Sequence, residues 1–196
     1  MNESRFLAFA ALLLALLTGA CSGAADTPPL EGARLGGPFT LTDQSGRKVS
    51  DTSFPGKYKL IYFGYTFCPD VCPVDLQLIG RGLAAFEKSD PARAAKVQPI
   101  FITTDPERDT PAVLKEYVAN FHPRLIGLTG TPDEIAAVAK RHGVYYSKRE
   151  SSGMSDYLVD HVRVAILFDP QGKPIVIVPH DQGLEGVTRE LDKWVS

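Results

Sequence analysis

An apolar run that leads to two closely spaced cysteines constrains this chain more than any other feature. Tyr58 to Phe63 is mostly hydrophobic, which predicts a buried strand. The run continues through a short loop to Cys68 and Cys72, and between Val74 and Glu87 apolar residues recur at helical spacing. The sequence therefore predicts a buried strand, a loop that carries two thiols, and a helix that begins beside them.

The rest of the chain alternates between strands and helices. A turn at Asp43–Gly46 predicts a first hairpin, and a turn at Asp169–Gly172 predicts another between 164–168 and 175–178. A strand is expected at 97–102, and there is a further candidate strand at 144–148. A short apolar stretch lies at 125–128. Helices are expected at 110–120, 131–142 and 184–195. This order predicts an α/β chain with a thioredoxin-like mixed sheet flanked by helices, an N-terminal β-hairpin and a hairpin inserted near the site.

Composition excludes several classes of protein. The chain has 196 residues, 44% of them hydrophobic, which is enough for one globular domain and too apolar for a disordered chain. A formal net charge of -2 gives no support for a nucleic-acid partner, which usually requires a basic surface. Three cysteines are too few for a disulfide-stapled miniature domain, and also for a zinc site made of four cysteines.

The first residues indicate export. Phe6 to Leu17 is an unbroken apolar run of 12 residues, too short to span a bilayer and typical of a signal peptide. Thr18-Gly19-Ala20-Cys21 follows and resembles a bacterial lipobox, in which the cysteine becomes the acylated N-terminus. One departure is that Thr18 stands where leucine is preferred, and Leu17 lies one position earlier. The alternatives are a plain signal peptide cleaved near Ala20 and an uncleaved anchor.

These features predict three parts of the chain. Residues 1–20 are expected to be a lipoprotein-type signal peptide, residues 21–34 the acylated cysteine with a flexible tether, and residues 35–196 the folded domain. The expected location is the periplasmic side of a bacterial membrane, where the protein is held by its N-terminal lipid. The two remaining cysteines would then face an oxidising compartment.

Cys68 and Cys72 are suited to chemistry at the helix start. The partial positive charge at a helix N-terminus favours the thiolate. In a helical turn, positions i and i+4 come close enough for a disulfide. Either Pro69 or Pro73 could occupy the first turn. A purely structural disulfide is the alternative, but closing so short a loop adds little stability, so a redox-active or metal-binding dithiol is favoured.

Two thiolates suit copper(I), and an added imidazole would let the site hold both copper oxidation states. The chain has four histidines that could supply the imidazole. His122 and His142 lie at predicted helix ends, where a cation favours the helix dipole, and His180 at a turn is expected to be solvated. His161 lies at a strand entrance beside Asp160, whose carboxylate could orient the ring.

Three motifs together resemble the Sco/SenC family. They are Phe63-Gly-Tyr-Thr-Phe-Cys68-Pro-Asp-Val-Cys72-Pro, then Thr104-Asp-Pro-Glu-Arg-Asp-Thr-Pro111, then Tyr157-Leu-Val-Asp-His161. They occur in the family's order, and the resemblance covers about the whole exported domain. It implies a thioredoxin-like copper protein whose ligands are Cys68, Cys72 and His161. Val162 departs from the Ser or Thr that many relatives have after the histidine, which puts only detail around the ligand in doubt.

The resemblance also implies a role in building the dinuclear copper centre of cytochrome c oxidase. The expected partners are the copper-bearing subunit of that oxidase and a periplasmic copper donor or thiol reductant. The motif from Thr104 to Pro111 is expected to be a structural loop beside the site, with contact of Asp105 and Asp109 with a partner as the weaker alternative. Asp70 is expected to be solvated rather than a ligand.

Two functions of different class remain open. One is a copper chaperone, which is not an enzyme in the strict sense. The other is a periplasmic thiol–disulfide oxidoreductase that uses Cys68 and Cys72 and delivers no metal. His161 discriminates between them, because a thioredoxin-like reductase needs no distant imidazole and a three-ligand copper site does. A peroxidase-like relative is disfavoured, because this loop lacks the signature of a single peroxidatic cysteine.

Overall fold

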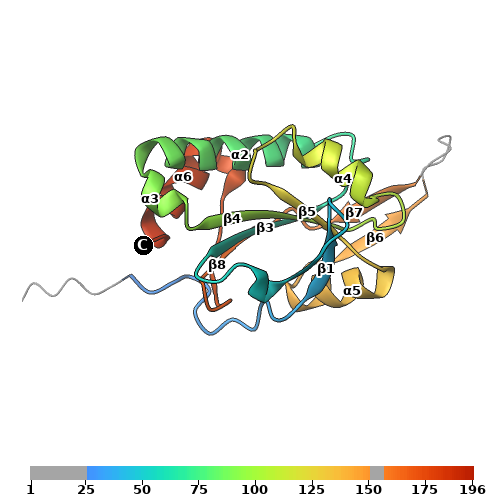
Figure 1. Cartoon of the computed structure of the whole chain (residues 1–196), viewed down its shortest axis with the longest axis horizontal. Coiled ribbons are helices and arrows are strands. Elements are labelled where there is room, and N and C mark those ends of the chain that lie inside the picture. The colour runs from blue at the N-terminus through green and yellow to red at the C-terminus, as the bar shows by residue number, and fades with distance from the viewer. Residues whose placement is uncertain (1–25, 151–156) are drawn as a thin grey trace, which may run out of the picture.

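A seven-stranded mixed sheet forms the centre of the molecule in the computed structural model, which describes residues 26–150 and 157–196 (Figure 1). The strands lie in the order β2-β1-β5-β4-β3-β8-β9. They are β1 (Thr40–Asp43), β2 (Lys48–Ser50), β3 (Tyr58–Gly64), β4 (Val97–Thr103), β5 (Ile126–Thr129), β8 (Ala165–Phe168) and β9 (Pro174–Ile177). The helices are α2 (Val71–Ser89), α3 (Pro91–Ala94), α4 (Pro111–Val118), α5 (Pro132–Arg141) and α6 (Leu184–Trp194), with short 3-10 turns η1 (Asp51–Ser53) and η2 (His180–Gln182).

The strand directions make this a thioredoxin-like sheet. β3, β4 and β5 run parallel, with Ile61 opposite Ile100 and Ile100 opposite Ile126. β8 is antiparallel to β3 and forms a hairpin with β9, and β1 is antiparallel to both β2 and β5. The predicted fold class, the first hairpin and the hairpin around Asp169–Gly172 are therefore confirmed.

Helices cover both faces of the sheet, and successive residues of β3 alternate between two cores. Leu60 and Tyr62 belong to the core shared with α2, α4 and α6, whereas Ile61 and Phe63 belong to the core shared with α5. All seven residues of β3 are buried, as expected for a parallel strand covered on both faces. The chain leaves the carboxyl end of this strand at Gly64 and enters the thiol loop.

Local sequence signals explain where the helices begin. Thr131 and Glu134 form a capping box at the start of α5, with Pro132 at its first position. At the start of α4, the side chain of Thr110 accepts the backbone N–H of Val113, and Pro111 is at the first position. α2 begins at Val71, so Pro73 lies in its first turn, where a proline costs no intrahelical hydrogen bond.

A separate two-stranded sheet lies beside the central one. It consists of β6 (Tyr146–Arg149) and β7 (Leu158–His161), paired antiparallel with Tyr146 opposite His161. This is the inserted hairpin expected near the site. Among the described residues, its backbone forms no ladder with the seven-stranded sheet.

A buried carboxylate connects four segments of the fold. Asp75 of α2 is fully buried and accepts hydrogen bonds from the hydroxyl of Tyr62 (2.8 Å) and from Nε and Nη2 of Arg163 (3.0 and 2.6 Å). Nε2 of His180 lies 3.3 Å from the same carboxylate. Burial alone would raise the pKa of Asp75, but the contacts from His180, Arg163 and Tyr62 hold it well below its usual range.

The expectation that His180 is solvated is therefore wrong, because this residue is 5% exposed and packs between Asp75 and the ring of Tyr62. His142 is also buried, among Phe39, Phe63 and Phe168, and burial lowers its pKa. His142 is therefore at the end of α5 as part of an aromatic cluster, and it is not a solvated cation that interacts with the helix dipole.

His122 is also buried, and its Nε2 lies 3.3 Å from Glu87 of α2. Burial lowers the pKa of His122 despite that carboxylate. α4 ends at Val118, so His122 lies beyond the helix end at which it was expected, and it packs against Glu87 instead.

The signal-peptide and lipobox predictions, including Cys21, fall outside the described residues. Part of the expected tether is described: Leu30 donates its backbone N–H to the carbonyl of Ile175 (3.0 Å) and packs against the core beside α5. The domain boundaries at 20/21 and 34/35 stay predictions. Within the described ranges, no helix has the length and hydropathy needed to cross a membrane.

The Asp75 cluster predicts a specific dependence of stability on pH. Burial alone would lower the pKa of His180, but Asp75 outweighs it and raises that pKa. The stability that protonated His180 contributes is therefore complete below about pH 6.5, the ordinary histidine pKa, and is lost as the pH rises through the raised value. We expect His180→Gln to cost about 1–3 kcal/mol near pH 6, and less at pH 9, in urea unfolding of the reduced, metal-free protein.

His122→Gln is the matched control. Because the pKa of His122 is lowered, its contribution is complete above about pH 6.5 and is lost as the pH falls, which is the opposite trend. Equal slopes for the two variants would contradict the ion pair between His180 and Asp75.

Candidate metal centre

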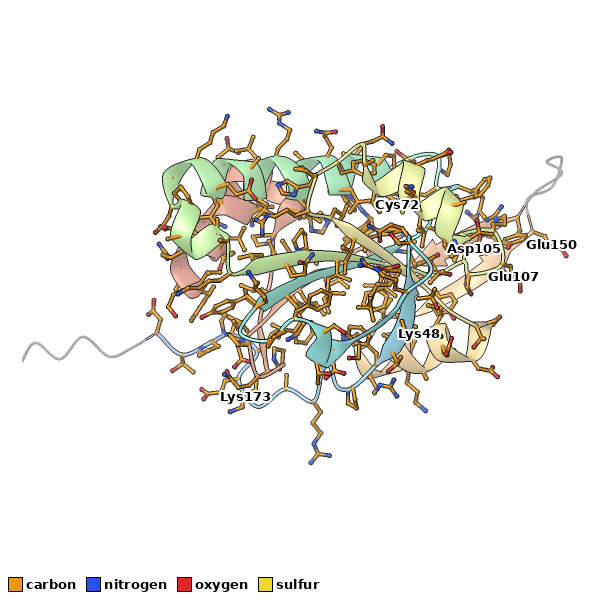
Figure 2. The ribbon with its side chains drawn as sticks, in the orientation of Figure 1. Lys48, Cys72, Asp105, Glu107, Glu150 and Lys173 are labelled. Carbon is orange, nitrogen blue, oxygen red and sulfur yellow. The ribbon has the colours of Figure 1, made fainter. Side chains whose placement is uncertain are left out.

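Two thiols and one imidazole meet at the N-terminus of α2. The ligand atoms of Cys68, Cys72 and His161 all lie within 4.8 Å of one another. Cys72 is in the first turn of α2 and fully buried, Cys68 lies in the preceding loop and is partly buried, and His161 ends β7. Figure 2 shows Cys72 at the same end of the molecule as Asp105 and Glu107. Of the four histidines considered from the sequence, His161 is the one that lies beside the thiols.

The histidine is oriented so that one nitrogen faces the thiols. Nε2 of His161 lies 3.1 Å from Sγ of Cys72, and Nδ1 lies 3.2 Å from the carbonyl of Val162. If Nδ1 carries the proton and donates to that carbonyl, Nε2 keeps its lone pair for a thiol proton or a metal ion. The rings of Tyr62 and Tyr65 meet the imidazole edge-on and limit its rotation.

The suggestion that Asp160 orients His161 is wrong. Asp160 points away from the imidazole contacts and pairs with Arg149 across the hairpin, at 3.2 Å. Because β7 alternates its side chains between two faces, neighbouring residues in this strand cannot both face the thiols. The carbonyl of Val162 takes the place that the sequence suggested for the carboxylate.

The two thiols differ in acidity because they share one site. The hydrogen bond from Cys72 lowers the pKa of Cys68 well below its usual range, although burial opposes the shift, and His161 adds to it. The same hydrogen bond raises the pKa of Cys72, and the burial of Cys72 adds to that effect. The backbone N–H of Cys72 also points to the sulfur of Cys68, at 3.4 Å. Cys68 is therefore the more acidic of the two thiols, and Cys72 holds its proton more strongly.

Asp109 holds the loop that carries Cys68. It is fully buried and accepts hydrogen bonds from the backbone N–H of Thr66 (3.0 Å), the hydroxyl of Thr66 (2.6 Å) and the hydroxyl of Thr103 (2.5 Å). Asp105, equally buried, accepts from the hydroxyl of Tyr157 at 2.7 Å and so anchors the segment that leads into β7. The structural-loop prediction is confirmed, and the weaker idea that these carboxylates contact a partner is wrong because neither reaches the surface.

The surroundings of the centre are mostly apolar. Cys72 packs with Tyr65 and Val159, and Cys68, Val71, Tyr146 and Tyr157 border this cluster. Asp70, between the two cysteines, is exposed as expected, and its carboxylate does not lie with the ligand atoms of Cys68, Cys72 and His161. Val162 is 43% exposed, next to His161 at the surface. An apolar surround with soft sulfur donors suits a soft cation better than a hard one.

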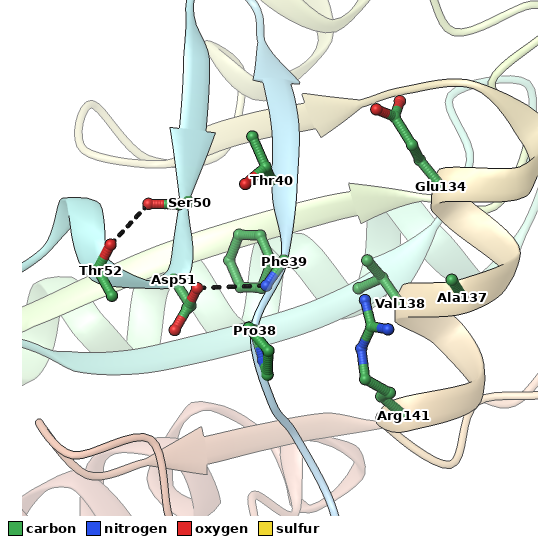
Figure 3. A pocket seen from close by; sticks show the side chains of 10 residues that line it. All are labelled: Pro38, Phe39, Thr40, Ser50, Asp51, Thr52, Glu134, Ala137, Val138 and Arg141. Atoms are coloured by element: carbon green, nitrogen blue, oxygen red, sulfur yellow. Dashed lines mark hydrogen bonds between the residues drawn. The ribbon is translucent and has the colours of Figure 1, made fainter.

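One hollow in the described part of the surface lies away from this centre. A groove of about 550 Å³ runs between the first hairpin and α5. Figure 3 shows its lining, with the backbone N–H of Phe39 bonded to Asp51, and with Glu134 and Arg141 projecting from α5. None of its lining residues comes from α2 or β7, so the groove is separate from the thiol–imidazole centre.

Sequence reasoning missed two residues beside the centre. Asp75 follows Cys72 by three residues on α2, and Arg163 follows His161 by two. A signal was available: an aspartate stands directly before Leu76 on the apolar face of a helix, and a buried charge there requires a partner. Its partner could not be identified from the sequence, because Arg163 lies 88 positions away.

Comparison with known proteins agrees with this geometry. Residues 27–196 match the family model described as SCO1/SenC. Over 166 residues the chain is 41% identical to Protein SCO2, mitochondrial, of Saccharomyces cerevisiae, which covers 82% of this chain and 54% of that protein. The chain thus spans about half the length of this relative.

Two solved structures are similar throughout the folded part. The structure of Bradyrhizobium japonicum ScoI with copper bound is 44% identical, with a TM-score of 0.73, and the match covers 82% of this chain and 99% of that one. The crystal structure of Arabidopsis thaliana ScoI with copper bound is 39% identical, with a TM-score of 0.75, covering 81% and 97%. Because the family model spans nearly all of the described residues and these relatives share the fold, the chain belongs to the SCO1/SenC family.

Proposed function

We propose that this protein binds copper through Cys68, Cys72 and His161, and that it delivers the metal to the dinuclear copper centre of cytochrome c oxidase or maintains the cysteines of that centre. The observation that carries the proposal is the convergence of two sulfurs and one imidazole nitrogen within 4.8 Å. The copper bound in two relatives of 39% and 44% identity supports the choice of metal. Copper is the cargo, and the protein is a metallochaperone.

The donor set is matched to copper in both oxidation states. Two thiolates suit copper(I), and the imidazole adds the nitrogen donor that copper(II) prefers. Because the pKa of Cys68 is lowered and that of Cys72 is raised, the proton that copper binding displaces should come mainly from Cys72. The partly exposed positions of Cys68 and His161 leave the site open to a partner that takes the metal.

The same thiols support a second candidate, a thiol–disulfide oxidoreductase. A partly exposed thiolate at Cys68 beside a buried thiol at Cys72 can attack a partner's disulfide. In that exchange the partner gains two thiols, and this protein loses two in forming its own disulfide. The imidazole beside Cys72 favours the copper function, because thiol exchange does not require a third ligand.

We further propose that the domain works on the periplasmic side of a bacterial membrane, tethered through acylated Cys21. The partners would be the copper-bearing oxidase subunit and a periplasmic copper donor or thiol reductant. The support is the apolar run of residues 6–17 followed by the lipobox-like residues 18–21.

Oxidation should abolish copper binding. Cys68 and Cys72 are expected to form an intramolecular disulfide, which leaves neither sulfur as a thiolate ligand. We expect about one copper(I) per reduced protein and none per oxidised protein, measured by metal analysis after anaerobic desalting. Cys68→Ser and Cys72→Ser should each behave like the oxidised protein, while Asp70→Ala should match wild type. Equal copper uptake by reduced and oxidised protein would exclude a dithiolate site.

His161→Ala separates the two functions. Copper(I) can still bind between two thiolates, but copper(II) loses its nitrogen donor, so copper(II) affinity should fall by more than about 100-fold and copper(I) affinity far less. Competition titration with chelators measures both affinities. Disulfide formation with a small disulfide should proceed at nearly the wild-type rate.

Thermal unfolding of metal-free His161→Ala distinguishes a ligand from a packing residue, since loss of a ligand changes stability little without copper. Oxidase assembly in cells should fail. If the variant binds copper(II) as tightly as wild type and still supports assembly, the oxidoreductase becomes the better proposal.

The anchor has its own test. Cys21→Ala should remain unprocessed or leave the membrane fraction, because an alanine cannot accept the lipid. Labelling with a radioactive fatty acid, followed by fractionation, measures this. Equal labelling of the variant and wild type would refute acylation of Cys21.

A further inference from the structure

The position of His161 relative to Cys72 is not set by a backbone ladder. His161 ends β7, and among the described residues β7 pairs only with β6, in a sheet separate from the one that contains β3. Cys72 lies on α2, which packs on the seven-stranded sheet. The two residues are 89 positions apart, yet their Nε2 and Sγ atoms lie 3.1 Å from each other. Side-chain contacts therefore help to hold the hairpin against the helix, together with the short connection from His161 to β8.

One carboxylate connects the two parts directly. Asp75 lies one turn after Cys72 on α2, and residues three apart in a helix share one side. Arg163 follows His161 by two residues and places Nε and Nη2 3.0 and 2.6 Å from the two oxygens of Asp75. This is a two-point guanidinium–carboxylate contact, which fixes both distance and orientation.

The other partners of Asp75 make this connection rigid. Its side chain is fully buried, while that of Arg163 is 45% exposed, so the pair lies at the edge of the core. The hydroxyl of Tyr62 and Nε2 of His180 also contact this carboxylate, both at Oδ2. Tyr62 comes from β3 and His180 from η2, so Asp75 cannot shift without breaking contacts to three segments.

A second contact holds the opposite end of β7. Tyr157, just before the strand, donates to Asp105 at 2.7 Å, and the guanidinium of Arg108 lies 3.8 Å from the centre of the Tyr157 ring. The strand that ends in His161 is thus attached at both ends, and Arg163 is the attachment nearer the imidazole.

We propose that the Arg163–Asp75 ion pair is a positioning device that holds the imidazole of His161 at metal-binding distance from Cys72. The proposal rests on the copper site proposed above and deepens it. Without the pair, the thiols stay in place on α2 and its preceding loop, but the end of β7 that carries His161 loses its nearest attachment to α2, so the distance from the imidazole to Cys72 is less closely fixed. Copper(II), which depends on the imidazole, should be affected, and copper(I), held by the thiolates, should be affected far less.

Arg163→Met tests this proposal, because it keeps the unbranched apolar stem of the side chain and removes the guanidinium. Asp75 keeps its contacts with Tyr62 and His180, which limits the damage to the core. We expect copper(II) affinity to fall about 10–100-fold, the range typical for partners that orient a ligand, with copper(I) affinity within about threefold of wild type. The thiolate-to-copper(II) absorption band should also shift or weaken, which a general loss of stability would not produce.

Arg149→Met is the matched control. Arg149 pairs with Asp160, so its loss removes an arginine–aspartate pair that joins the two strands of the hairpin to each other but not to α2. This variant should retain wild-type affinity for both copper ions and the wild-type absorption band.

Combining Arg163→Met with His161→Ala makes the test specific. If Arg163 acts through the imidazole, the double variant should bind copper(II) no more weakly than His161→Ala alone. Additive losses, or an Arg163→Met variant with wild-type copper(II) affinity and spectrum, would overturn the positioning role. If His161→Ala itself leaves copper(II) binding intact, the proposed copper site fails, and that result is distinct from either outcome for Arg163.

Arg163→Lys covers the case in which Arg163→Met does not fold. Lysine keeps the charge but makes a single contact in place of two, so an intermediate loss of copper(II) affinity supports the proposal. Wild-type affinity and spectrum in a folded Arg163→Lys protein would contradict the need for the two-point contact.

Discussion

Burial of β3 on both faces is the constraint from which the site is built. Its residues alternate between two cores, one under α2, α4 and α6 and one under α5, so this strand must pass through the middle of the molecule. A strand so enclosed has little freedom of register or direction. The loop at the carboxyl end of β3 therefore lies in a fixed position, beside the first turn of α2. The positions of Cys68 and Cys72 therefore follow from the burial of β3.

The chemistry of the thiols then follows from their place at the helix start. Cys72 lies inside the first turn and is fully buried, whereas Cys68 lies outside it and receives the backbone N–H of Cys72. The pKa of Cys68 is lowered and that of Cys72 is raised, which lowers the work needed for Cys68 to bind a metal or attack a disulfide. A fold suited to thiol exchange becomes a candidate copper site through one further donor, the imidazole of His161.

Buried polar groups connect the remaining parts to this centre. Asp109 holds the loop before Cys68, Asp105 holds Tyr157, and Asp75 holds Arg163. Each carboxylate is fully buried, so each loses its hydration and must be compensated by donors from distant segments. This requirement explains why the loops around the centre converge. It also makes charged residues, rather than apolar packing alone, responsible for the relative placement of the ligands.

The sequence by itself determined the local features of this protein. The buried strand before Cys68, the capping box at Thr131 and Glu134, and the proline-initiated helices depend on neighbouring residues, and periodicity and capping report such neighbours directly. Only the tertiary structure decided which histidine lies beside the thiols. It also decided that His142 and His180 are buried and that Asp75 pairs with Arg163. The contact of Cys72 with His161 joins residues 89 positions apart, and that of Asp75 with Arg163 joins residues 88 positions apart, across a separate hairpin and a central sheet. No local pattern encodes such pairings, because they arise from how the layers pack.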